Sequence, residues 1–235
     1  MRQYRKSILC VSGNSPKMLQ DAPVFDSDGI VLDLEEAVAS EENDSARLLV
    51  KEALRFLDYS DVDVIVRINP LSSAFGEKDI ELIARERPFA LMVPQASAEQ
   101  IAQIDSMLVQ IEKEEGMPAG AIKLIPVIET AYALQYVHQI VISSPRITGA
   151  FLNAEGLTAD FGMQRTKEGE EILYARSRVV VACRAEGLNA IDTPFMDTDD
   201  FEGLEKDCYK ARNMGFTGKA AIDGRQIDTI HRFFS

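Results

Sequence analysis

The sequence lacks several features that mark particular classes of protein. Its 235 residues include only three cysteines, Cys10, Cys183 and Cys208, which are far apart and lack the spacing of metal ligands. Cys10 and Cys183 lie in apolar runs, so we expect buried free thiols in a reducing compartment. The net charge is −13 and no run of lysine and arginine is present, which argues against nucleic-acid binding.

Long apolar stretches are also missing. The N-terminal "MRQYRKSILCVSGN" has only a short apolar run, which is not a secretory signal, and no segment approaches the length of a membrane span. We therefore expect a cytoplasmic protein without membrane contact. Hydrophobic residues make up 46% and charged residues 27%, as in ordinary globular proteins. No linker or repeat divides the chain, so a single domain over residues 1–235 is predicted.

Short runs rich in valine, isoleucine and leucine recur along the chain, and buried parallel strands have this composition because both of their faces are covered. They lie at 7–11, 29–34, 62–68, 89–94, 122–128, 147–153, 188–192 and 218–222. Helical patterns stand between them, at 16–22, 44–57, 76–86, 97–116, 131–141, 171–187 and 201–215. This alternation predicts a (β/α)₈ TIM barrel. A doubly wound sheet is the alternative, but neither its glycine fingerprint nor a P-loop is present.

Polar residues follow several of the predicted strands, and the active sites of barrels form at these carboxyl ends. Arg67, Glu129, Glu35 and Asp192 stand there. Because a barrel interior is apolar, such charges must be paired or must hold a ligand. Arg67 is suited to a substrate carboxylate, and Glu129 with a second acid to a hard cation such as Mg²⁺, which would stabilise an enolate. The alternative is an ion pair of Arg67 with Glu35 or Glu129 that only closes the barrel top.

The stretch "AFLNAEGLTADFG", residues 150–162, ends the sixth predicted strand. We expect a buried strand, a tight turn and then a polar loop. Glu155 stands where the strand stops, and Asp160 follows within the loop. Three interpretations of this segment stay open: a metal site, part of one, or a simple loop.

Several motifs in order and spacing carry a family resemblance: "RKSILCVSGN", "GIVLDLEEAV", "VRINP", "IPVIETAYAL", "ILYARSRVVVACRAEGLNAID" and "NMGFTGKAAIDGRQI". Over nearly its whole length the chain resembles the citrate lyase β-subunit-like (CitE-like) branch of the HpcH/HpaI aldolase superfamily. The resemblance implies a barrel that assembles into homotrimers or hexamers. It also implies carbon–carbon lyase chemistry on citryl, citramalyl or malyl thioesters, carried on coenzyme A or on an acyl-carrier protein.

The resemblance also implies roles for individual residues. Arg67 matches the arginine that binds the substrate carboxylate. Glu129 matches the glutamate that binds metal and contacts substrate. Glu35 matches the acid of a D-x-E-D motif that organises the site, and this motif ends here in Glu36. We therefore expect Arg67, Glu129 and Glu35 to be catalytic.

The metal site implied by the resemblance departs from the family pattern. The second ligand is usually the aspartate of a Glu-Asp pair, but the pair here is Glu155-Gly156, and glycine has no side chain to bind a metal. We expect a weakened Mg²⁺ site at Glu129 and Glu155, with Asp160 as a possible substitute ligand.

Other departures concern the carrier and the end of the chain. Gln95 replaces a lysine, and Asp223-Gly224 replaces His-Pro, so the barrel mouth is less attractive to a polyanion such as coenzyme A. Many relatives continue into a C-terminal lid that carries a catalytic aspartate to a neighbouring subunit. This sequence stops at Ser235, so we expect a barrel without that lid.

Three functions stay open at this point. The first is a Mg²⁺-assisted lyase that cleaves the thioester by a retro-Claisen or retro-aldol step, with Glu35 or Asp192 as its acid–base group. The second is a catalytically impaired or accessory barrel that binds a small carboxylate or a partner protein. The third is an aldolase acting on a free oxo-acid without coenzyme A.

Overall fold

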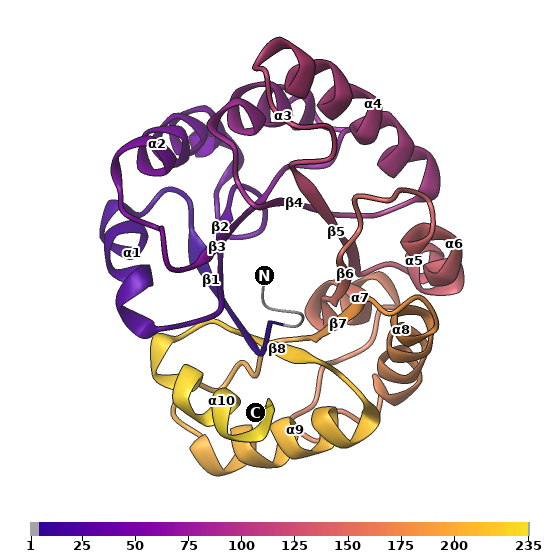
Figure 1. Cartoon of the computed structure of the whole chain (residues 1–235). Helices are drawn as coiled ribbons and strands as arrows, with labels where there is room; N and C mark the ends of the chain where they lie inside the picture. Colours follow the sequence, from indigo (N-terminus) through magenta and orange to yellow (C-terminus); the bar gives the residue numbers. More distant parts are fainter. Residues whose placement is uncertain (1–4, 235) are drawn as a thin grey trace.

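The computed structural model describes residues 5–234 and folds them into a closed barrel of eight parallel strands (Figure 1). The strands pair in sequence order, and the last returns to pair with the first. They are β1 (Ser7–Ser12), β2 (Gly29–Asp33), β3 (Asp63–Arg67), β4 (Ala90–Val93), β5 (Lys123–Ile128), β6 (Gly149–Leu152), β7 (Asn189–Asp192) and β8 (Gly218–Ala221). The predicted TIM barrel is confirmed, and the doubly wound alternative, which has open edges, is wrong. Ser235, where the sequence ends, lies outside the described residues.

Helices surround the ring of strands (Figure 1). They are α1 (Pro16–Asp21), α2 (Asn43–Phe56), α3 (Gly76–Ile83), α4 (Ala98–Glu114), α5 (Ala131–Gln135), α6 (Val137–Val141), α7 (Ala154–Asp160), α8 (Leu173–Ala185), α9 (Phe201–Met214) and α10 (Ile227–Phe234). Short 3₁₀ turns are η1 (Ala22–Phe25), η2 (Ser40–Glu42), η3 (Ala84–Glu86) and η4 (Gly224–Gln226). Across residues 5–234, no helix combines the length and the apolar character needed to cross a bilayer.

The segment after β6 differs from its prediction. The stretch after β6 was expected to be a polar loop, but residues 154–160 form helix α7. Asn153 caps this helix, because its side-chain oxygen accepts a hydrogen bond from the Gly156 backbone N–H at 3.3 Å. Leu157 and Thr158 are buried on its inner side. The Asn-Ala-Glu-Gly sequence is thus a helix start rather than an open turn.

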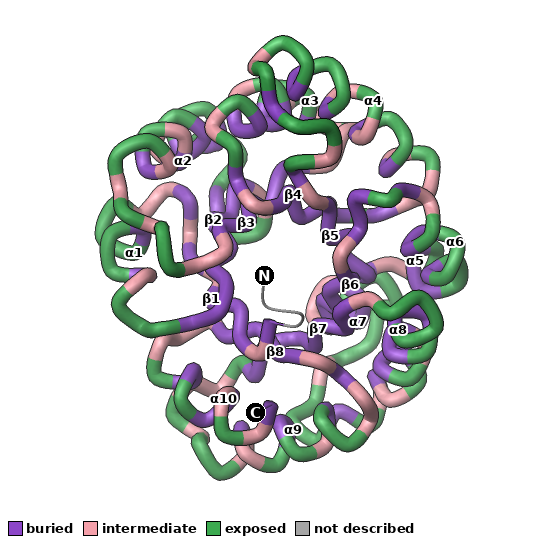
Figure 2. Tube along the Cα trace, viewed as in Figure 1, coloured by how far each residue is buried: buried purple, intermediate pink, exposed green. Residues whose placement is uncertain are grey.

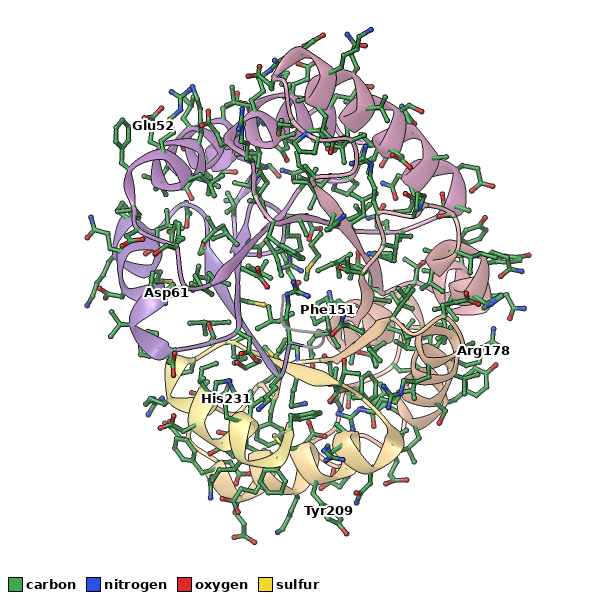
Figure 3. All side chains as sticks on the ribbon, viewed as in Figure 1. Glu52, Asp61, Phe151, Arg178, Tyr209 and His231 are labelled. Atoms are coloured by element: carbon green, nitrogen blue, oxygen red, sulfur yellow. The ribbon has the colours of Figure 1, made fainter. Side chains whose placement is uncertain are left out.

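The barrel interior follows the period of two that strands impose on side chains. One apolar cluster fills the ring, and it includes Val31, Ile65, Val127 and Phe151. Phe151 is labelled inside the ring in Figure 3. A second cluster packs the outer strand faces against the helices. The strands are therefore buried on both faces, while the outer helix surfaces are exposed (Figure 2).

Candidate functional site

The strand period also selects which residues enter the barrel mouth. Asp33, Arg67 and Glu129 each lie two positions after an inward-facing residue of their strand. These inward-facing residues are Val31, Ile65 and Val127, respectively. Each continues the inward-facing row of its strand. Two beyond Phe151 comes Asn153, which continues the row of β6 in the same way. One acid, one arginine, a second acid and an amide therefore meet at the carboxyl end of the barrel.

Asp33 fixes Arg67. The two residues are register partners at the ends of β2 and β3. Oδ1 of Asp33 accepts a hydrogen bond from Arg67 Nε at 2.7 Å, and Oδ2 accepts one from Nη2 at 2.5 Å. The same oxygens accept the backbone N–H groups of Glu35 and Ala37, both at 2.9 Å. Burial opposes the charge of Arg67, but this carboxylate outweighs it and raises the arginine pKa.

Sequence reasoning missed Asp33, although it stands inside the same D-x-E motif as Glu35. The expected partner of Arg67 was Glu35 or Glu129. The side chain of Glu35 lies 3.8 Å from Arg67 Nη1, too far for a hydrogen bond, whereas Asp33 and Glu36 make the close contacts. The alternation along β2 would have identified Asp33, because it shares the inward face of Val31.

Glu129 lies across the mouth, with both carboxylate oxygens occupied. Oε1 accepts the backbone N–H of Gln95 at 2.7 Å, and Oε2 accepts Nδ2 of Asn153 at 2.8 Å. Gln95 has a φ of 48°, a left-handed conformation that is unfavourable for this residue and that accompanies the contact. Burial raises the pKa of Glu129, although the two donated hydrogen bonds and Arg67 oppose the rise.

Glu36 joins the two sides of the mouth. Its Oε2 accepts a hydrogen bond from Arg67 Nη1 at 2.5 Å and one from Asn153 Nδ2 at 3.3 Å. The side chain of Glu36 is 49% exposed, whereas Arg67 is 8% and Asp33 is 2% exposed. Arg67 therefore has one buried, fixed acid and one acid that faces solvent.

Glu35 is the acid with the most unusual titration. Its side chain is 25% exposed and, among residues 5–234, it accepts no hydrogen bond within normal distance. Burial raises the pKa of Glu35 to about 7, Arg67 opposes this, and the nearby Glu129 carboxylate adds to it. A carboxyl group with this pKa exchanges protons near neutral pH, which suits a general acid or base.

The other predicted ligands have different partners. Glu155 Oε1 lies 3.3 Å from Arg165 Nε, and Asp160 Oδ2 accepts the backbone N–H of Ala131 at 2.7 Å. Gly156 does face the site: a Cβ atom built there would lie 3.0 Å from Asn153 Nδ2 and 3.2 Å from Glu129 Oε2. The structure thus places position 156 against the Glu129 carboxylate.

Asp192 is not part of the mouth, which corrects its candidacy as an acid–base group. It is fully buried, with ion pairs to Arg176 at 2.9 Å and to Lys219 at 2.7 Å. The neighbouring Thr193 is the residue that reaches toward the site, since its hydroxyl oxygen accepts the Ala154 backbone N–H at 3.1 Å. Asp192 therefore supports the strand end, while Thr193 positions the start of α7.

A cavity of about 300 Å³ opens at this mouth. Cys10, Met92 and Phe151 line it together with Arg67 and Asn153. It adjoins a cavity of about 320 Å³ at the β1–β8 edge, with which it shares Val11, Met18 and Ile222. Burial raises the pKa of the Cys10 thiol to about 12, so this group stays protonated and unreactive.

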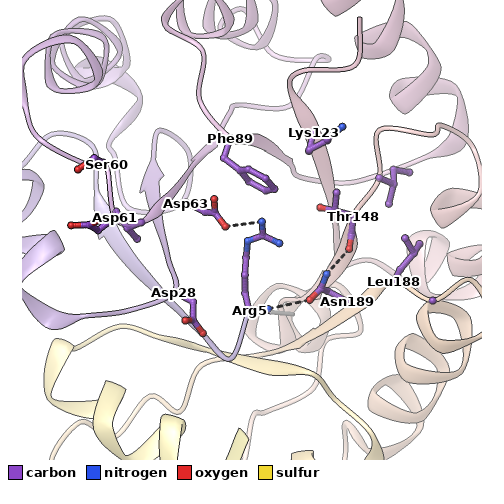
Figure 4. Close-up of a pocket in the computed structure, with 13 residues that line it drawn as sticks. Arg5, Asp28, Ser60, Asp61, Asp63, Phe89, Lys123, Thr148, Leu188 and Asn189 are labelled. Atoms are coloured by element: carbon purple, nitrogen blue, oxygen red, sulfur yellow. Dashed lines mark hydrogen bonds and ion pairs between the residues drawn. The ribbon is translucent and has the colours of Figure 1, made fainter. Parts of the chain in front are cut away.

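A larger cavity, of about 530 Å³, lies at the opposite end of the barrel, where the strands begin (Figure 4). Arg5 crosses it, with Nη2 at 2.7 Å from Asp63 and the guanidinium 4.0 Å from the centre of the Phe89 ring. The Arg5 backbone N–H donates to Asn189 Oδ1 at 3.3 Å. These contacts close the barrel floor, and this end of a barrel serves stability, so the smaller cavity is the candidate site.

Comparison with known proteins places this site in a family. The HpcH/HpaI aldolase/citrate lyase family matches residues 6–224. The chain belongs to this family. It is 36% identical to citrate lyase subunit beta of Haemophilus influenzae over 99% of this chain and 80% of that protein. It is 34% identical to mitochondrial citramalyl-CoA lyase of Rattus norvegicus over 98% of this chain and 71% of that protein.

A solved structure extends the comparison. The citrate lyase beta subunit of M. tuberculosis, complexed with oxaloacetate and magnesium, is 25% identical, with a TM-score of 0.83 over 100% of this chain and 99% of that chain. The resemblance to the CitE-like branch is thus confirmed, and so is the prediction that the chain is a member of a lyase family.

The donor groups of this chain do not fit a magnesium centre built on paired carboxylates. Gly156 offers no ligand, and Glu155 forms an ion pair with Arg165. Each oxygen of Glu129 accepts one hydrogen bond and keeps a lone pair for a ligand, so Glu129 is the one expected ligand that stays suitable. Within the described part of the chain, no three acidic, histidine or cysteine side chains are grouped to hold a metal ion. Mg²⁺ is usually bound through one or two carboxylates and keeps several waters, and the residue that lies against Glu129 here is Gly156, which offers no second carboxylate.

Proposed function

We propose that the protein is a carbon–carbon lyase that cleaves a hydroxy-acyl thioester of a dicarboxylic or tricarboxylic acid by a retro-Claisen or retro-aldol step. The supporting observation is Arg67, which is held rigidly by Asp33 and opens onto a cavity of substrate size. In this proposal its guanidinium binds the free carboxylate of the substrate. Family membership and relatives named as lyases point to the same chemistry.

Glu35 is the proposed proton carrier. The hydroxyl proton of the substrate passes to the Glu35 carboxylate, and the O–H electron pair forms the new carbonyl group. The carbon–carbon bond breaks, and its electron pair moves into the acyl thioester as an enolate. Glu35 then returns the proton to the enolate carbon, which releases an acetyl thioester and an oxo-acid. A carboxyl group with a pKa near 7 is suited to accept and return a proton in turn.

Asn153 and Arg67 are the proposed stabilisers of negative charge. Their Nδ2 and Nη1 groups converge on one point of the cavity wall, which Glu36 Oε2 now occupies. Donors that meet at such a point bind the negative charge of a substrate carboxylate oxygen. Glu129 fixes Asn153 through the 2.8 Å hydrogen bond and is itself fixed by Gln95. In this proposal Glu129 contacts the substrate and orients the amide.

The arm that links the acyl group of the substrate to its carrier is proposed to extend out of the site through the cavity at the β1–β8 edge. Its wall is apolar at Leu9, Val11, Phe25 and Ile222, which suits a long, mostly uncharged arm. Lys17 stands in the same wall. Carboxylates outnumber guanidinium groups at the neighbouring mouth, so the polyanionic end of coenzyme A is expected outside it. Assembly into a homo-oligomer remains part of the proposal.

The test is an assay of citramalyl-, malyl- and citryl-CoA with the purified protein, with products identified by mass spectrometry. Turnover of one thioester that falls at least 100-fold in Arg67→Ala and in Glu35→Gln supports the proposal. Full activity in Arg67→Ala would contradict it. Both variants are first checked for a native circular dichroism spectrum, because Arg67 also pairs with buried Asp33.

A second candidate is a barrel that binds a small carboxylate without turnover. The position of Gly156 against Glu129, where a second acid would complete a cation site, favours it. Calorimetric binding of oxaloacetate that depends on Arg67, together with no product from any thioester, would support this candidate. Cleavage of a free hydroxy-oxo-acid into two carbonyl products instead would support an aldolase that needs no coenzyme A.

A further inference from the structure

We propose that Glu36 occupies the substrate-carboxylate site of the free protein and must swing away before an anionic substrate reaches Arg67. Glu36 then sets the affinity and selectivity of the site for carboxylates. This inference rests on the proposed role of Arg67 in substrate binding, and the experiment below separates the two.

The first argument is the position of one oxygen. Glu36 Oε2 accepts from Arg67 Nη1 at 2.5 Å and from Asn153 Nδ2 at 3.3 Å. These donors come from the ends of β3 and β6, which lie three strands apart in the ring, and a single oxygen joins them. A carboxylate oxygen of a ligand would bind at the same point, where a charged and a neutral donor meet. Glu36 therefore stands where the ligand oxygen is expected.

The second argument is that Glu36, unlike Asp33, is free to move. Asp33 is 2% exposed and binds Arg67 through two oxygens, which also accept two backbone N–H groups. Glu36 is 49% exposed, and its side-chain hydrogen bonds among residues 5–234 are the two to Arg67 and Asn153. An incoming carboxylate therefore competes with Glu36 and leaves Asp33 in place.

The third argument is that only the side chain has to move. The backbone around Glu36 is fixed, because the Ala37 N–H donates to Asp33 Oδ2 at 2.9 Å and the Ala37 carbonyl accepts the Ser12 hydroxyl at 2.9 Å. Rotation about the side-chain bonds of Glu36 moves its carboxylate into solvent without a change in the barrel. A shorter aspartate at this position would fall about 1.5 Å short of Arg67, the length of one carbon–carbon bond.

The expected consequence is a lower affinity for a carboxylate ligand, because Glu36 occupies its site in most molecules of the free protein. When the competent state is a fraction of the population, the apparent dissociation constant rises by the inverse of that fraction. A charge-assisted hydrogen bond that is half exposed to solvent is strong enough to keep the site closed for most of the time. We expect a roughly tenfold lower Kd for a dicarboxylate when the contact is removed.

The experiment is calorimetric titration of oxaloacetate into the wild type and four variants. Glu36→Gln removes the charge at the same size, and Glu36→Asp keeps the charge but loses the reach. Glu41→Gln is the matched control, because Glu41 is an exposed acid in η2 of the same connection and, among residues 5–234, forms no hydrogen bond or ion pair with Arg67. Arg67→Ala tests the site itself.

We expect Kd to fall about tenfold in Glu36→Gln and several-fold in Glu36→Asp, with less than a twofold change in Glu41→Gln. Where turnover is measurable, Glu36→Gln should lower KM and leave kcat nearly unchanged, which a merely structural residue would not do. Equal tightening in Glu41→Gln, or no tightening in either Glu36 variant, overturns the inference about Glu36. Unchanged binding in Arg67→Ala, or no binding in any variant, overturns the proposed function instead.

Discussion

Replacement of Gly156 by aspartate should create a magnesium response that the natural chain has only weakly or not at all. Position 156 lies in the first turn of α7 and has no left-handed φ, so an aspartate can adopt its backbone conformation. The new Cβ would lie 3.0 Å from Glu129 Cβ and 3.2 Å from Glu129 Oε2. The neighbours must therefore yield by a few tenths of an ångström, and the new carboxylate must lie beside that of Glu129.

The size of the effect follows from the charges. Two carboxylates about 4 Å apart repel by about 4 kcal/mol at an effective dielectric constant of 20. An acid in the first helical turn stabilises the helix by about 0.3–1 kcal/mol, and aspartate is a slightly better helix former than glycine, by about 0.2 kcal/mol. Without metal, Gly156→Asp should therefore be about 3 kcal/mol less stable than the wild type. Mg²⁺ at one hundred times its Kd would restore about 2.7 kcal/mol.

The assay is thermal unfolding with and without 10 mM Mg²⁺, an excess of about one hundredfold over a Kd of about 0.1 mM. For a chain of this length the variant's Tm should rise by about 5–10 °C, while the wild-type Tm moves little. Gly156→Asn is the matched control, because it adds the same volume without charge and should not respond. A folded Gly156→Asp that ignores Mg²⁺, or an equal response from Gly156→Asn, would refute the placement of position 156 beside Glu129.

Three further outcomes follow from single contacts. Asp33→Asn breaks a buried pair with Arg67, so the free energy of urea unfolding should fall by about 3 kcal/mol and oxaloacetate binding in calorimetry should be lost; unchanged stability would contradict the pairing. Glu35 has a pKa raised by burial to about 7, so its contribution to wild-type stability declines as pH rises from about 4.5 to about 7 and stays low above that. Glu35→Gln should therefore match the wild type at about pH 4 and exceed it by up to about 3 kcal/mol at pH 8, as measured by urea unfolding; equal pH profiles would contradict this. Thr193→Val leaves the Ala154 N–H without its acceptor, so it should lower stability by about 1–3 kcal/mol and weaken oxaloacetate binding; a loss of stability alone would show that Thr193 does not position α7.

The fold was predictable because strand composition is a strong signal in barrels. Each of the eight runs rich in valine, isoleucine and leucine is a strand, since burial on both faces removes the polar alternation that open sheets show. The helices between them were also predicted, except α7, and the single helix predicted at 131–141 is divided into α5 and α6. Helix α7 is about two turns long, with a glycine at its third position, so periodicity gave no signal. Its start depends on Asn153, whose capping role is a single contact.

The main residues of the site could be predicted from the sequence, but the acid that pairs with Arg67 could not. Arg67 and Glu129 stand at the ends of short apolar runs, and strand ends in barrels converge on one mouth. The partner of Arg67 could not be chosen among Asp33, Glu35 and Glu36 without the register of β2 with β3, which sets Asp33 beside Arg67. Nor could the sequence tell that Asp192 faces outward, because that depends on Lys219 and Arg176 reaching it from other elements.

Two buried arginines in this barrel show why one is assigned to ligand binding and the other to stability. Arg176 is fully buried, and its partners Asp192 and Asp207 are 0% and 5% exposed, so every charge is neutralised inside the protein. Arg67 has one partner of that kind in Asp33, but its second acid is 49% exposed and faces a cavity. An ion pair with an exposed acid contributes less to stability than a buried one, so Arg67 can exchange Glu36 for a ligand at a lower cost than Asp33. Arg47 also pairs with one buried acid, Asp79, and one exposed acid, Asp44, so the feature that assigns Arg67 to ligand binding is the cavity onto which it opens.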